Sequence, residues 1–114
     1  YLIFYQAIKV LVNMLKTSKV NANYISNMIK VLKITDNVFK VVVNSTGQTE
    51  HIVKLSSKIH QNLTKGKISK IDLIIKSFEF LLKRESNQSI LREFNLEIIS
   101  QYFPDYLDQI TKDL

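Results

Sequence analysis

Apolar side chains recur at every third or fourth position along most of the chain, and this spacing restricts the fold more than any other feature. Residues three and four positions apart lie on one face of an α-helix, so the pattern is typical of amphipathic helices around a shared core. The chain also contains only two glycines and one proline. Because an all-β domain needs a turn every ten residues or so, this scarcity favours helices as well.

Helices are predicted throughout the first 85 residues. The first covers residues 2–17, and Asn21 or Asn23 can cap a second. A fourth begins at Thr49. A fifth begins at Ser69, which together with an acidic residue three positions later resembles a capping box. The apolar stripes of these four helices contain Phe4, Ile8, Leu11 and Leu15; Ile25, Met28, Ile29 and Leu32; Ile52, Leu55, Ile59 and Leu63; and Ile71, Ile74, Ile75, Phe78, Leu81 and Leu82.

The valine-rich run at residues 38–43 allows two structures. One is a short third helix capped by Thr35 or Asp36. Because valine is β-branched and residues 44–47 are turn-like, the alternative is a hairpin that pairs this run with residues 50–55. The helix is preferred because an isolated hairpin would have little support in a helical chain.

The predicted fold is therefore all-α: a compact, HEAT-like bundle of stacked helical hairpins with five core helices and one or two C-terminal helices. A sixth helix carries Leu91, Phe94, Ile98 and Tyr102, and a seventh has Pro104 in its first turn. Residues 1–85 are expected to form an interaction domain, and residues 86–114 a helical extension packed on it. Because the chain begins with a tyrosine, it is expected to be part of a longer protein.

The net charge of +6 is unevenly distributed. Residues 1–70 contain eleven lysines and two acids, whereas residues 71–114 contain five basic and eight acidic residues. A basic N-terminal part attracts acidic peptides or nucleic acid, although a solvated lysine-rich surface would look the same.

The sequence contains no recognisable catalytic or metal-binding pattern. It has no cysteine, and its two glycines form no phosphate-binding loop. His51 and His60 are nine positions apart, so a surface or capping role is favoured over metal binding. We therefore expect no enzyme, no metal, no cofactor, no small-molecule substrate and no membrane span. The absence of cysteine fits a reducing, intracellular compartment.

Two groups of residues are candidates for binding. The first is the predicted interhelical loop Lys65-Gly66-Lys67-Ile68, followed by Lys70. Here an exposed isoleucine beside lysines could receive a peptide with acidic and apolar residues. Alternatively, Ile68 packs inward as the residue before the Ser69 cap. The second group is Tyr102, Phe103 and Tyr106, for which packing in the core is favoured.

Several fragments resemble the N-terminal helical domain of transcription elongation factor S, and most closely the integrase-binding variant of that family. The resemblance spans Ala7 to Arg84. The fragments that carry it are Val20-Asn21, Ile34-Thr35, Thr49-Glu50-His51-Ile52-Val53-Lys54-Leu55 and Lys67-Ile68-Ser69-Lys70-Ile71.

The resemblance implies a nuclear scaffold that docks short disordered motifs of transcription or chromatin factors. Two loops would form the docking face, Thr17-Ser18-Lys19 and the loop from Lys65 to Lys70. The first loop lacks the family's acidic residue, and Gly66 replaces its phenylalanine, while Ile68 matches its valine. The alternatives are non-specific nucleic-acid binding through the basic N-terminal two thirds, and a structural fragment of a larger helical scaffold.

Overall fold

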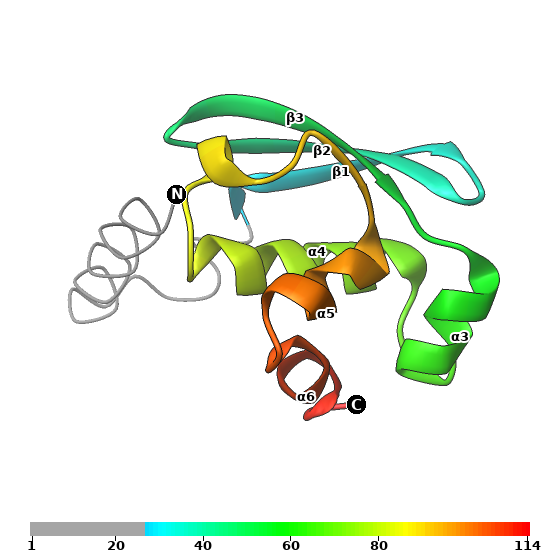
Figure 1. Cartoon of the computed structure of the whole chain (residues 1–114). Coiled ribbons are helices and arrows are strands. Elements are labelled where there is room, and N and C mark those ends of the chain that lie inside the picture. The colour runs from blue at the N-terminus through cyan, green and yellow to red at the C-terminus, as the bar shows by residue number, and fades with distance from the viewer. Residues whose placement is uncertain (1–26) are drawn as a thin grey trace.

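The computed structural model describes residues 27–114, which form a mixed α/β fold (Figure 1). Four strands make one sheet in the order β1-β2-β3-β4. Strands β1 (Ile29–Thr35), β2 (Val38–Ser45) and β3 (Gly47–Lys54) pair antiparallel, and β4 (Glu93–Asn95) pairs parallel with β3. The predicted all-α, HEAT-like bundle is therefore wrong. The predicted helix at 2–17 lies outside the described residues.

Strands β2 and β3 form the hairpin that was the alternative to a third helix. Phe39 pairs with Val53, and Val43 pairs with Thr49. The buried side chains of β2 are Phe39, Val41 and Val43, which alternate along the strand with less buried ones. The run therefore satisfied a period of two as well as the helical spacing, and its β-branched residues favour the strand.

Strand β1 replaces the end of the second predicted helix. Ile29 is buried and pairs with Val43, as expected of a core residue, but Leu32 is 43% exposed. In a helix these two residues would share a face, whereas in a strand an odd separation places them on opposite faces of the sheet. Pairing with β2 therefore overrides the helical spacing.

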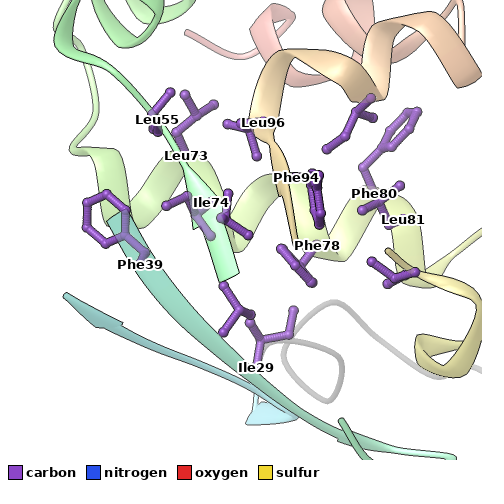
Figure 2. Close-up of a cluster of buried hydrophobic side chains, with 14 of the residues drawn as sticks. Ile29, Phe39, Leu55, Leu73, Ile74, Phe78, Phe80, Leu81, Phe94 and Leu96 are labelled. Carbon is purple, nitrogen blue, oxygen red and sulfur yellow. The ribbon is translucent and has the colours of Figure 1, made fainter. Parts of the chain in front are cut away.

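Helices α3 (Ser57–Thr64) and α4 (Lys70–Leu82) connect β3 to β4. Helix α4 confirms the fifth predicted helix, and its cap is confirmed because Ser69 Oγ accepts a hydrogen bond from Asp72 N at 3.0 Å. The fourth predicted helix begins at Ser57 instead of Thr49, because the preceding residues belong to β3. The buried face of α4 packs under the sheet, as Figure 2 shows for Leu73, Ile74, Phe78 and Leu81.

The sixth predicted helix is divided into several short elements: β4, a 3₁₀ turn at Leu96–Ile98 and helix α5 (Ile99–Tyr102). A further 3₁₀ turn, η1, covers Asn87–Ser89. Helix α6 (Tyr106–Thr111) corresponds to the seventh predicted helix. Helices α4, α5 and α6 lie on one side of the sheet (Figure 1). No helix within residues 27–114 is long and apolar enough to span a membrane.

Candidate functional site

The predicted docking loop connects α3 to α4. Lys65, Gly66 and Lys67 are exposed there, and the chain turns through positive φ values at Lys65 and Gly66. Ile68 is only partly exposed and packs against the core, which agrees with its inward, non-anchoring interpretation. The other predicted docking residues, Thr17, Ser18 and Lys19, lie outside the described residues.

Lys70 has a structural role beside this loop. Its Nζ donates hydrogen bonds to Asp36 O at 2.8 Å, Asn37 Oδ1 at 2.9 Å and Ser57 Oγ at 3.0 Å. One ammonium group thus ties the β1–β2 turn to the beginnings of α3 and α4. His60, which is partly exposed on α3, contacts the carbonyl oxygen of Ile68 through Nε2 at 2.6 Å. This contact ties α3 to the residue before the Ser69 cap and does not cap a helix itself.

A cavity of about 180 Å³ lies between the end of α4, the segment leading into β4, and α5. We call it the Glu85 cavity. Its walls are mostly apolar, and besides Glu85 the hydroxyl-bearing side chains of Ser89 and Tyr102 line it. The apolar walls are formed by Leu81, Ile90, Leu91, Phe94, Ile98, Ile99 and Phe103.

Glu85 is the unusual residue of this cavity. Glu85 is only 7% exposed, and its carboxylate has no hydrogen bond or ion pair with another described residue. Burial raises the pKa of Glu85 to about 7, because the apolar surroundings disfavour the charged form. Among the described residues, every polar side-chain atom that is fully buried has a hydrogen-bond partner. Because the carboxylate oxygens of Glu85 have no partner, they are not fully buried and keep some surface that is accessible to solvent.

Two exposed apolar side chains lie at the cavity. Leu91 is 47% exposed and Tyr102 is 57% exposed, and both are lining residues. The expectation that Tyr102 packs in the core is therefore wrong, whereas Tyr106 is fully buried and Phe103 partly buried, as expected. Tyr106 is held by a 2.6 Å hydrogen bond between its hydroxyl group and Ser77 Oγ.

A buried polar network supports the cavity from the sheet side. Asn87 Nδ2 donates to Thr49 Oγ1 at 3.0 Å, and Thr49 Oγ1 lies 2.8 Å from His51 Nε2. His51 Nδ1 lies 2.7 Å from the carbonyl oxygen of Leu91. Since the carbonyl can only accept, Nδ1 carries a proton, and Nε2 of the neutral ring accepts from the Thr49 hydroxyl group. The network therefore positions the backbone of Leu91 at the cavity.

The same network contradicts a surface role for His51, which is fully buried in β3. Burial lowers its pKa, the hydrogen bond to Leu91 opposes this shift, and Arg92 adds to it. Within residues 27–114, no group of three histidine, aspartate or glutamate side chains is arranged to hold a metal ion.

A second cleft, of about 320 Å³, lies between α4 and α6 and is lined by Lys76, Lys83, Arg84 and Lys112. Two of these cations are already engaged. Lys76 Nζ donates to Ile110 O at 3.0 Å, and Arg84 pairs with Asp105 at 2.7 Å while its guanidinium group lies over the Phe80 ring. This cleft is therefore a weaker candidate than the Glu85 cavity.

No protein-family model matches the chain, and comparisons with curated proteins and with solved structures find no significant match. The helical fold implied by the resemblance to the elongation factor S domain is contradicted by the four-stranded sheet. The site must therefore be interpreted from its own geometry.

Sequence reasoning missed Glu85, although the sequence contained a signal. On α4, Phe78 and Leu81 belong to the buried stripe, and Glu85 follows Leu81 by four positions. A lone acid on the continuation of an apolar stripe indicates either the end of the buried face or a buried carboxyl group. The structure shows the second.

Proposed function

We propose that this chain is a protein-binding domain, and that one side chain of a partner occupies the Glu85 cavity. The observation that carries this proposal is an apolar cavity flanked by two exposed hydrophobic residues, Leu91 and Tyr102. Buried anchors surrounded by apolar contacts provide most of the binding energy in protein interfaces.

The size of the cavity supports a side chain over a cofactor. Drug-sized ligands and cofactors use pockets of roughly 300–1,000 Å³. An engineered apolar cavity of about 150 Å³ binds benzene. The 180 Å³ of the Glu85 cavity therefore suits one large side chain. Transcription or chromatin factors as partners, which the sequence resemblance implies, stay a prediction.

Selection of peptides from a random display library tests this proposal. The wild-type chain should enrich peptides that share one large anchoring side chain. The variant Leu91→Ser should lose them, because it removes the apolar contact beside the cavity without adding a charge. Leu32→Ser is the matched control, because Leu32 is similarly exposed but lies in β1. Equal enrichment by Leu91→Ser, or no enriched peptide at all, would reject the proposal.

Nucleic-acid binding is a second candidate, favoured by the lysines around α3. Lys58, Lys65 and Lys67 are exposed and have no ion pair within the described residues. If they bind phosphates, changing all three to glutamate should abolish DNA binding, and wild-type affinity should fall steeply with salt. A salt-independent affinity, or binding retained by the triple variant, would reject this candidate.

A further inference from the structure

We propose that the partner side chain in the Glu85 cavity is a lysine or arginine, whose cationic group pairs with the Glu85 carboxylate. This inference rests on the proposed function and specifies the chemistry of its ligand. The cation is supplied by a partner protein.

The buried Glu85 carboxylate lacks a partner in the described part of the chain. A buried carboxylate without a partner is costly, and a cation with hydrogen-bond donors relieves that cost most effectively. Within residues 27–114, neither a charged side chain nor a hydrogen-bond donor satisfies it. A leucine or phenylalanine anchor would remove the carboxylate further from water and leave it unpaired, so the cavity discriminates against apolar anchors.

The walls of the cavity fit a long cationic side chain. Lysine and arginine have aliphatic stems that pack on apolar surfaces such as those of Leu81, Ile90 and Ile99. The rings of Phe94 and Phe103 also line the cavity, and aromatic faces attract cations.

Arg84 provides an internal precedent for this arrangement. Its guanidinium carbon lies 3.6 Å from the centroid of the Phe80 ring, and its Nη2 lies 2.7 Å from Asp105 Oδ2. The fold thus already places one cation between an aromatic ring and a carboxylate. Glu85, the next residue along the chain, lines a cavity together with Phe94 and Phe103 and has no cationic partner among residues 27–114.

No cationic side chain of residues 27–114 lines the cavity. Arg84 is paired with Asp105, and Arg92, which keeps its charge because its partner Gln88 Oε1 at 3.2 Å is neutral, is not a lining residue. Tyr102 is the other titratable side chain that lines the cavity. Residues 71–114, which contain the whole cavity, hold eight acids against five basic residues, whereas residues 27–70 hold eight lysines against two acids. A cation is therefore attracted to the C-terminal part of the domain.

Binding of butylammonium, the side-chain analogue of lysine, tests the inference on the 1–114 chain. The neutral analogue 1-butanol has the same number of heavy atoms and serves as the reference ligand. Amide chemical shifts of the lining residues report the affinities. At pH 8, butylammonium should bind more tightly than 1-butanol. Between pH 8 and pH 6 its affinity should fall about tenfold, because protonation near pH 7 removes the carboxylate charge. The affinity for 1-butanol should show no such fall.

The variant Glu85→Gln keeps the shape of the side chain and removes the charge. It should bind 1-butanol within about twofold of wild type, which also shows that the cavity is intact, and it should lose the preference for butylammonium. Glu79→Gln, a neutral substitution on α4 outside the cavity, is the matched control and should keep that preference. A preference for butylammonium that survives in Glu85→Gln would overturn the inference.

The outcomes separate this inference from the proposed function. If library peptides bind through a leucine or phenylalanine anchor and 1-butanol binds as well as butylammonium, the cationic anchor is rejected while the protein-binding function stands. If neither probe binds and no peptide is enriched, both are rejected. Self-association of the wild-type chain that Glu85→Gln abolishes would assign the cation to a second copy and overturn the proposed partner.

Discussion

Asn87 Nδ2 donates a hydrogen bond across 3.0 Å to Thr49 Oγ1, and this contact joins the segment after α4 to strand β3. Asn87 also accepts from Thr46 N at 3.1 Å and donates to Gly47 O at 3.2 Å. One buried amide therefore closes the β2–β3 turn and begins the chain of hydrogen bonds that reaches Leu91 through His51.

Replacing Asn87 with alanine should destabilise the domain by about 2–4 kcal/mol, because buried partners lose their hydrogen bonds together. Urea unfolding measures this difference. The neighbouring variant Gln88→Ala is the control: Gln88 is exposed and reaches the same turn through Thr46 O, so its loss should cost about 1 kcal/mol or less. Equal losses of unfolding free energy in the two variants would show that the buried network contributes no extra stability.

Lys70→Met should destabilise the domain by about 1 kcal/mol, because the methionine keeps the aliphatic stem and loses the three hydrogen bonds of the ammonium group. Lys67→Met, at an exposed lysine in the loop before α4, should leave the free energy of unfolding unchanged. Thermal unfolding of both variants checks this. If Lys70→Met is as stable as wild type, Lys70 does not hold the β1–β2 turn.

Acid should destabilise the domain through His51. Its pKa is lowered in the folded state, so below about pH 6.5 the unfolded chain binds a proton that the folded chain does not. The contribution of His51 to stability is therefore present above that pH and is lost as the pH falls. The difference in unfolding free energy between wild type and His51→Gln should shrink from pH 7 to pH 5. A pH-independent difference would contradict the buried, neutral histidine.

Glu85 should act on stability in the opposite direction. Its pKa is raised from 4.5 to about 7 on folding, so between these values the unfolded chain loses a proton that the folded chain retains. Its contribution to stability is therefore greatest below pH 4.5 and is lost as the pH rises to about 7. Relative to Glu85→Gln, the wild-type chain should lose stability over this interval. A wild-type stability that instead rises with pH relative to Glu85→Gln would contradict this prediction, because it would mean that folding favours the ionised form of Glu85.

Some of the fold could be predicted from the sequence because the signal was local. The Ser69 cap and the stripe of α4 depend on neighbouring residues of one helix, and both were found. Residues 49–55 misled the prediction because Ile52 and Leu55 fit a helical stripe that continues into α3. The true alternation of buried residues in β3 includes Thr49 and His51, whose polar side chains hid it. Asn87, which donates a hydrogen bond to the buried Thr49 hydroxyl group, is 38 positions away along the chain.

The candidate site could not be predicted because it depends on tertiary packing. Glu85 lines a cavity together with Phe94 and Ile99, which come from separate short elements. The sequence prediction put Phe94 and Ile98 on one regular sixth helix. In the structure this segment is divided between β4, a 3₁₀ turn and α5, and the cavity is lined by residues of all three regions. The lysine loop was visible in the sequence, but the engagement of Lys70 with Asp36 and Ser57 was not.

The cationic anchor requires a reachable, unpaired carboxyl group in the apolar cavity at the end of α4. Titration of the Glu85 side-chain carboxyl carbon by NMR measures whether this group is present. We expect a midpoint near pH 7 in the free chain and a lower midpoint when butylammonium is added, because the bound cation favours the ionised form. A midpoint close to 4.5 in the free chain, unchanged by butylammonium, would contradict it.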